Sequence, residues 1–271
     1  MRNLFIMWKY PRMAAWFILG TFFLLLARLP FFAAPMIPHY LEFNPGVALV
    51  PLLGVFWGPA AVWSALAASL LGDWITGIWS SLSIFKAVGM ASMAFTAQYL
   101  WDTGAPNAYA GRKHTHSWVS TIHYLHAATA GCFVSAAWTG LGADMSRLYP
   151  FPYISALVLV HHLIFANLPG IAFYRFTVRE VLPDWGNWRS AMENEYPIPV
   201  PTHFAAVAVW VTGTGACVAG WVVSAVFYRI TPLKAYVLGN CCGTGLAAIL
   251  ILFLAAHSFL LLRGPRHKKK R

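Results

Sequence analysis

A group of charged and amide side chains in the first third of the sequence could bind a small polar solute. Its members lie at the ends of apolar segments or just inside them: Arg28, Glu42, Asn44, Asp73 and Lys86. The dipeptide Gly58-Pro59 is typical of a turn between two helices packed as a hairpin. Such a turn brings the start of one helix beside the end of the next. We therefore expect Asn44 and Asp73 to share one polar pocket with Glu42.

Two of these five residues are basic, and their positions suggest that they are paired. Arg28 lies within an apolar segment, where an ionisable group is costly and usually has a partner. Its nearness to Pro30 also allows the alternative that its side chain reaches outward to the membrane interface. Lys86 could pair with Asp73. The alternatives are that this pair is purely structural, or that the acid is solvated at a helix end.

Histidines offer a second kind of chemistry. His126, His161 and His162 fall near the middle of apolar segments, and His257 lies in the last one. Two facing imidazoles from different helices could ligate a haem b, and imidazole also binds copper or zinc ions. The alternative is that each ring hydrogen-bonds a neighbouring helix or lines a polar cavity with Asn167. No spacing among the histidines decides between these possibilities.

The sequence lacks the fingerprints of known catalytic and nucleotide-binding sites. It contains no G-x-S-x-G, H-E-x-x-H, P-loop or Rossmann pattern. Its four cysteines show neither a C-x-x-C pair nor the spacing of a zinc finger. We therefore expect no catalytic activity of its own, no structural zinc and no disulfide framework.

Composition indicates that the elements carrying these residues lie in a membrane. Of the 271 residues, 59% are hydrophobic and 10% are charged, and the mean hydropathy is +0.61. A soluble domain carries about 25% charged residues. Apolar segments recur along the whole chain without an internal repeat, so we expect residues 1–271 to form a single multi-pass membrane domain.

The predicted fold is an all-α bundle of about eight membrane-spanning helices. Pro, Gly and charged residues divide the apolar segments into 13–34, 45–57, 59–78, 83–101, 118–140, 152–174, 204–228 and 236–262. The second segment is short, because thirteen helical residues rise about 20 Å against the ~30 Å hydrocarbon core. It is either a short helix or half of a re-entrant pair. The first segment resembles a signal peptide superficially, but we interpret it as a retained span.

The distribution of basic residues predicts the orientation of the bundle. With both termini in the cytoplasm, the inner segments hold fourteen Lys and Arg residues and the outer loops hold three. The basic tail at 263–271 would contact anionic lipids, and 175–203 would form a cytoplasmic interfacial loop. These positions explain the net charge of +11 without nucleic acid as a partner. The predicted location is the inner (plasma) membrane of the cell.

One stretch resembles a known family. The residues "FNPGVALVPLLGVFWGPAAV", the following "LLGDW" and "SIFKAVGMASMAFTAQYLWD" (83–102) resemble the substrate-binding S components of energy-coupling-factor transporters. The resemblance covers residues 42–102 and extends to the membrane-embedded sensor domains of some bacterial signalling proteins. It implies a small helical bundle that binds a vitamin or a metal from outside and docks on a transmembrane coupling subunit. The Ala-xxx-Ala docking pattern belongs to that family's first span, whereas here the spacing occurs at Ala61/Ala65 and Ala87/Ala91.

Together these observations predict a membrane component that captures a small solute at an outward-facing site. The site would be built from the five polar residues of the first third of the chain, and membrane protein subunits would be its partners. A haem- or metal-bearing redox subunit that uses the mid-span histidines is an alternative. Another is an accessory subunit of a larger membrane complex, which would have no site of its own.

Overall fold

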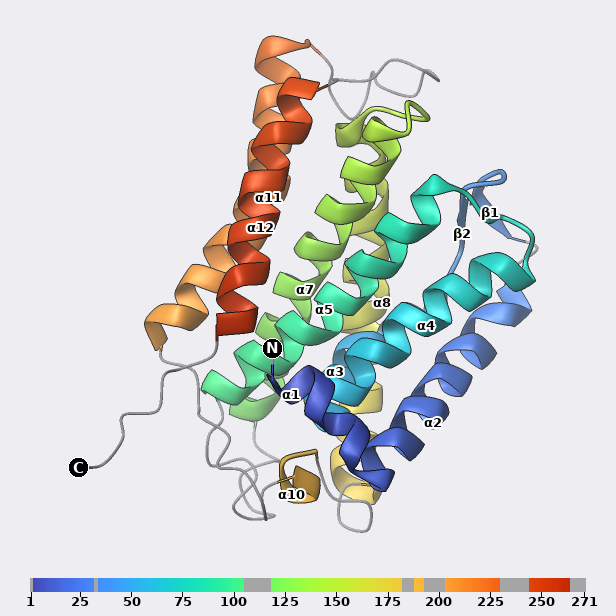
Figure 1. Ribbon diagram of the computed structural model, residues 1–271, viewed down its shortest axis with the longest axis vertical. Helices are drawn as coiled ribbons and strands as arrows, with labels where there is room; N and C mark the ends of the chain where they lie inside the picture. The colour runs from blue at the N-terminus through green and yellow to red at the C-terminus, as the bar shows by residue number, and fades with distance from the viewer. Residues whose placement is uncertain are drawn as a thin grey trace.

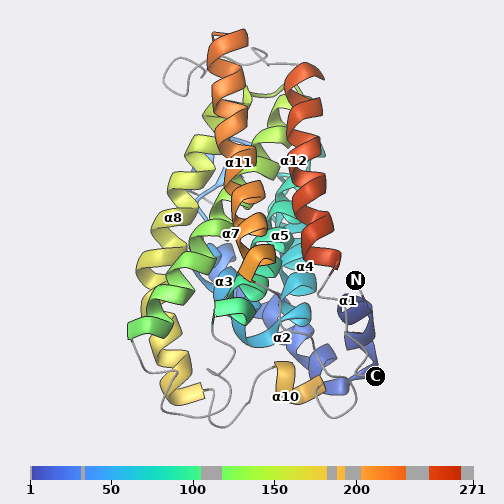
Figure 2. The same cartoon turned by 90° about the vertical axis from the view of Figure 1, so that its left-hand side faces the viewer.

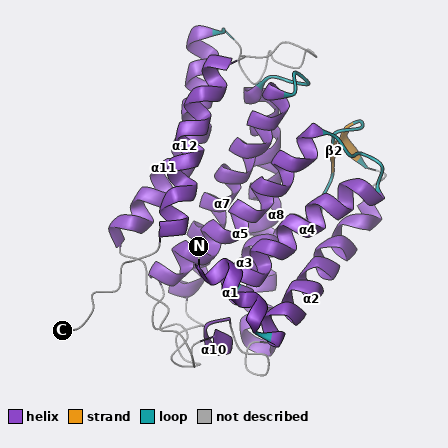
Figure 3. Cartoon of the chain, viewed as in Figure 1, coloured by secondary structure: helices purple, strands orange, loops and turns teal. Residues whose placement is uncertain are grey.

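The computed structural model describes residues 2–31, 34–104, 118–181, 188–192, 203–229 and 244–263. Within these ranges the chain is helical except for short turns and one two-stranded hairpin (Figure 3). The elements of the first half are α1 (Arg2–Ile6), η1 (Met7–Lys9), α2 (Pro11–Arg28), η2 (Leu29–Phe31), β1 (Pro35–Ile37), β2 (Leu41–Glu42), η3 (Pro45–Ala48), α3 (Leu49–Trp57), α4 (Pro59–Ile75) and α5 (Ser81–Gly104). Those of the second half are α7 (Trp118–Met145), α8 (Phe151–Phe176), the π-helical turn η4 (Thr177–Val181), α10 (Trp188–Met192), α11 (His203–Phe227) and α12 (Thr244–Arg263).

Four of the described helices are long and apolar enough to cross a membrane. They span Pro11–Phe31, Phe151–Arg179, His203–Phe227 and Gly245–Leu262, and Pro45–Trp57 is a shorter apolar helix. The helices α5 and α7 are also long, with 24 and 28 residues. The chain is therefore an all-α membrane protein, as its composition predicts.

The predicted segments coincide with helices, but several of their ends differ: α4 ends at Ile75 rather than at 78, and α7 continues to Met145 rather than ending at 140. The first helix ends at Arg28 and a 3-10 turn continues to Phe31, so its predicted end at residue 34 is wrong. The predicted loop 175–203 begins too early, because α8 and the following π-helical turn continue to Val181. The predicted start of the last segment, 236–243, and the basic tail from 264 lie outside the described residues.

The helices form a bundle in which α5 and α7 occupy the centre (Figure 1), and α8 packs on α7 and lies at the outer edge in Figure 2. Beside the central pair, α2 packs on α4, and on the other side α11 pairs with α12 (Figures 1 and 2). The short α3 packs between α5 and α8. The core therefore lies around α5 and α7.

Small residues allow these helices to approach closely. A side chain at Gly54 of α3 would collide with the backbone of Ala94 in α5, and one at Gly20 of α2 would lie 2.6 Å from Ser64 Oγ in α4. The predicted turn at Gly58-Pro59 is confirmed, since Gly58 adopts φ 53° between α3 and α4. Only glycine adopts this conformation without strain. Close packing of this kind stabilises helices where water does not drive their association.

A buried histidine ties α12 to its neighbours. His257 Nδ1 lies 3.0 Å from the Val209 carbonyl oxygen and 3.1 Å from Thr212 Oγ1, both in α11, and its Nε2 lies 3.0 Å from Thr96 Oγ1 in α5. A carbonyl oxygen only accepts, so Nδ1 carries the proton and Nε2 accepts from the threonine. We call these four residues the His257 node. Both ring nitrogens of His257 have partners in neighbouring helices. Of the two roles that the sequence allowed for this histidine, the structure therefore shows hydrogen bonding between helices.

Candidate functional site

Four charged side chains meet at one end of α2, α4 and α5. Arg28 forms ion pairs with both Glu42 and Asp73, and its Nη1 also donates to the Ser69 carbonyl oxygen at 3.0 Å. Lys86 Nζ donates to the two carboxylate oxygens of Asp73 at 2.8 and 2.7 Å. We call Arg28, Glu42, Asp73 and Lys86 the ionic cluster. The predicted pairing of Lys86 with Asp73 is confirmed.

The burial of this cluster excludes two of the alternatives that the sequence allowed. Asp73 is 0% exposed, so it is not a solvated acid at a helix end. Arg28 is 4% exposed and its side chain turns to the two acids, so it does not reach outward to the interface. A buried charge without a partner is strongly destabilising. The mutual pairing of these residues is therefore a condition for their burial.

Local structure brings the cluster together from four elements. Arg28 is the last residue of α2, Asp73 lies in the last turn of α4, and Lys86 lies in the second turn of α5. Gly72 makes room for the guanidinium group, because any side chain at that position would collide with Arg28. Glu42 comes from β2, which pairs antiparallel with β1. The sequence did not predict this hairpin, and its turn contains His39 at φ 66°.

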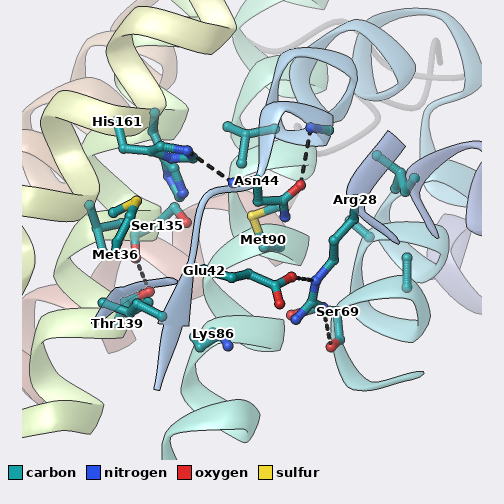
Figure 4. A pocket seen from close by; sticks show the side chains of 18 residues that line it. Arg28, Met36, Glu42, Asn44, Ser69, Lys86, Met90, Ser135, Thr139 and His161 are labelled. Atoms are coloured by element: carbon teal, nitrogen blue, oxygen red, sulfur yellow. Dashed lines mark hydrogen bonds and ion pairs between the residues drawn. The ribbon is translucent and has the colours of Figure 1, made fainter. Parts of the chain in front are cut away.

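A small cavity lies beside the ionic cluster. It has a volume of about 60 Å³, and Figure 4 shows it between the hairpin and the helices. Its lining consists of Leu24, Arg28, Met36, Leu41, Glu42, Asn44, Gly46, Val47, Ala65, Ala68, Ser69, Lys86, Met90, Ser135, Thr139, Val158, His161 and His162. We call it the polar cavity. Residues of the N-terminal half and of α7 and α8 line it together. Four of the five predicted site residues are among them, and the fifth, Asp73, pairs with the lining residues Arg28 and Lys86.

Three polar atoms of the lining residues have no hydrogen-bond partner within the described part of the chain. They are Glu42 Oε2, Ser135 Oγ and His162 Nδ1, and all three are buried. Leaving such an atom without a partner costs about 1–3 kcal/mol. A cavity of this volume holds several water-sized groups, since one water needs about 10–15 Å³. The polar cavity therefore has room for a small ligand, and three of its lining residues carry a hydrogen-bonding atom that the described chain leaves unpartnered.

Asn44 and His161 are linked at the upper wall of the polar cavity in Figure 4. The side-chain oxygen of Asn44 accepts from the Gly46 amide at 3.0 Å and caps η3. The backbone amide of Asn44 donates to His161 Nε2 at 3.2 Å. Because Nε2 accepts this hydrogen, the His161 ring is neutral and carries its proton on Nδ1. The predicted role of Asn44 thus changes in detail, because its backbone positions a histidine and its side-chain oxygen caps a helix.

His126 does not meet His161 or His162. Its ring stacks on Trp210 of α11, with ring centroids 5.4 Å apart and an interplanar angle of 10°. It lines a separate groove of about 580 Å³ with His123 and His203. The predicted haem or metal pair of His126 with His161 or His162 is therefore not brought together around either space. Over the described ranges, no group of three or more His, Cys, Asp and Glu residues could hold a metal ion.

The small-residue pair Ala61/Ala65 is used inside the chain. Both residues are buried, and α2 covers α4, on which they lie. In the second pair Ala87 is buried and Ala91 is half-buried. A face that docks on a partner subunit would therefore have to use residues other than Ala61 and Ala65.

Several lining residues were not predicted to belong to the site. Ser135 and Thr139 are two small polar residues in a long small-rich helix, and Met36 and Met90 resemble ordinary apolar residues. Only their position opposite the ionic cluster distinguishes them. The sequence pointed to this wall of the cavity only through the adjacent histidines of α8, because lining a polar cavity was one of the roles considered for them.

No family model matches this sequence, and neither a curated protein nor a solved structure is similar enough to count as a match. The likeness of residues 42–102 to S components therefore stays a prediction. The chemistry of the side chains around the polar cavity is the basis for inferring what it binds.

Proposed function

We propose that this chain is a solute-binding component of the plasma membrane, with its site in the polar cavity. In this proposal eight helices lie in the membrane and both termini are cytoplasmic. The hairpin and the ionic cluster then lie toward the outside. Membrane subunits that use the captured solute would be its partners, as the resemblance to S components implies.

The observation that carries this proposal is the set of three unpartnered polar atoms in residues that line one small cavity. Buried polar groups in folded proteins are nearly always hydrogen-bonded, and the exceptions need a physical reason. Glu42 Oε2, Ser135 Oγ and His162 Nδ1 all belong to lining residues of one small space. A solute that hydrogen-bonds to them supplies the missing partners, and it would be held by residues from three elements at once, β2, α7 and α8.

The positions of the basic residues support the proposed orientation. Their bias assigns α1 and the end of α12 to the cytoplasm, and these two ends lie toward the same half of the bundle in Figure 1. The hairpin lies at the opposite end of α2. A reporter fused after Arg271 should be active only in the form that works in the cytoplasm. Activity of a periplasmic reporter at this position would contradict the eight-helix arrangement.

The exposed apolar residues of α11 keep one alternative function open. They include Phe204, Val207, Val211, Val218, Val222 and Val226. Such a face suits lipid chains and an apolar subunit equally well. An accessory subunit would use this face without any need for the unpartnered atoms, so ligand binding distinguishes the two functions.

A solute screen tests the proposal directly. The purified protein in detergent is heated with a library of small polar solutes, and the unfolding temperature is recorded for the parent, Ser135→Ala and Ser64→Ala. The control is matched, because Ser64 is also buried but bonds Phe17 and Ala60 carbonyl oxygens and does not line the polar cavity. At least one solute should stabilise the parent and Ser64→Ala, and should stabilise Ser135→Ala less. Equal stabilisation of all three proteins would place binding elsewhere.

A further inference from the structure

The charges around the polar cavity cancel. The ionic cluster contains two bases and two acids, and each member is within ion-pair distance of another. The net charge of the ionic cluster is therefore zero, and moving a proton between Lys86 and Asp73 would not change it. His161 is neutral because its Nε2 accepts the Asn44 amide hydrogen. A solute that brought a net charge into this space would leave that charge without a counter-ion, which is costly inside a protein.

The unused hydrogen-bonding groups are of both kinds. Glu42 Oε2 belongs to a carboxylate paired with Arg28 and can only accept. Arg28 has five N–H groups and uses three of them for Glu42, Ser69 and Asp73. His161 has one further donor, its Nδ1–H, on a ring that lines the cavity. A bound solute therefore needs a donor for the carboxylate oxygen and an acceptor for these N–H groups.

The size and the walls of the cavity limit the rest of the solute. About 60 Å³ corresponds to roughly four to six water-sized groups, taking about 10–15 Å³ for each. Met36, Met90 and Val158 contribute apolar wall between the polar groups. We infer that the polar cavity selects small solutes of zero net charge with an amide-like pairing of donor and acceptor. This inference rests on the proposed function and names the chemical class of its solute.

Three molecules of nearly identical shape test this selectivity. Acetamide is neutral, acetate carries one negative charge and acetamidinium carries one positive charge, and each has four non-hydrogen atoms. Binding of each to the purified protein in detergent is measured by titration calorimetry. Acetamide should bind more tightly than either ion. In Ser135→Ala its affinity should fall by about tenfold, the value of one good hydrogen bond, whereas Ser64→Ala should match the parent.

Two charge-changing variants make the test reciprocal. Glu42→Gln leaves the surroundings of the cavity with one positive charge and should shift the preference from acetamide to acetate. Lys86→Gln leaves one negative charge and should shift the preference to acetamidinium. Ser135→Ala, which carries no charge change, keeps the inference testable if these variants fail to fold.

The possible results separate this inference from the proposed function. Tighter binding of acetate or acetamidinium to the parent would overturn the neutral class. If that binding still weakened in Ser135→Ala, the solute-binding function would stand. Absence of binding by all three also overturns the inference, because the fragments match the cavity in size. The solute screen then decides separately whether the cavity is a binding site at all.

Discussion

Two of the groups of polar side chains that the described part of the bundle buries can be compared, the polar cavity with its ionic cluster and the His257 node. Both link helices that are far apart in the sequence, and both lie among apolar residues. In the His257 node each ring nitrogen has a partner. Around the polar cavity, by contrast, three buried atoms of the described residues have none, and the space beside them is large enough for a ligand.

This difference separates a structural role from a binding role. A fully paired polar group fixes how helices pack and has nothing left to offer a ligand. A partly paired group lowers the stability of the empty protein and regains that loss when a ligand supplies the missing bonds. The same residue type, histidine, therefore serves packing at position 257 and faces the polar cavity at positions 161 and 162.

The largest effect is expected from Arg28→Gln. The change removes the cation that neutralises Glu42 and one of the two cations that neutralise Asp73, and both acids are buried. The free energy of unfolding should fall by roughly 3–5 kcal/mol, or the protein should fail to accumulate. Thermal unfolding in detergent measures this, with the exposed Arg229→Gln as control. A shift equal to that of the control would mean that the cluster does not stabilise the fold.

Asp73→Asn should cause a large loss of stability, which a second substitution at Lys86 should partly restore. Asparagine leaves Lys86 buried without its acid, and the expected loss is roughly 2–4 kcal/mol. Combining it with Lys86→Met removes the stranded charge, so the double variant should be more stable than Asp73→Asn alone. Unfolding temperatures of the four proteins in this cycle give the coupling between the two residues. If the double variant lost as much stability as the two single variants together, the two residues would not form a direct pair.

His257→Leu should have a moderate effect on stability. The substitution removes the ring that bonds Val209 and Thr96, and the expected loss is about 1–3 kcal/mol. The response to a solute should remain that of the parent, because His257 does not line the polar cavity. A reduced solute response in this variant would mean that the two polar groups are not independent.

The sequence predicted the parts of this fold that depend on local pattern. Apolar segments separated by Pro and Gly predicted the helices, and Gly58-Pro59 predicted the turn between α3 and α4. The pairing of Lys86 with Asp73 was also predictable, because both lie near the ends of consecutive segments joined by a short loop. Each of these features needs only information from neighbouring residues.

The missing features depend on contacts between distant segments. Ser135 lies about ninety residues from Glu42 along the chain, and nothing in α7 marks the face that turns to the hairpin. The burial pattern of an apolar membrane helix is weak because residues facing lipid and residues facing protein are both apolar. For the same reason His126 and His161 looked equivalent in the sequence, whereas they line separate spaces.

No loss of stability and the sharpest loss of binding are expected from Ser135→Ala. Its hydroxyl is buried without a partner in the described structure, so without solute the variant should be at least as stable as the parent, with a gain of up to about 1–3 kcal/mol in its free energy of unfolding. The decisive measurement is the rise in unfolding temperature of this variant with the most stabilising solute of the screen, beside that of His257→Leu. The account predicts that Ser135→Ala keeps its stability and loses most of the rise, while His257→Leu loses stability and keeps the rise. A full rise in Ser135→Ala, or an equal loss of the rise in both, would contradict it.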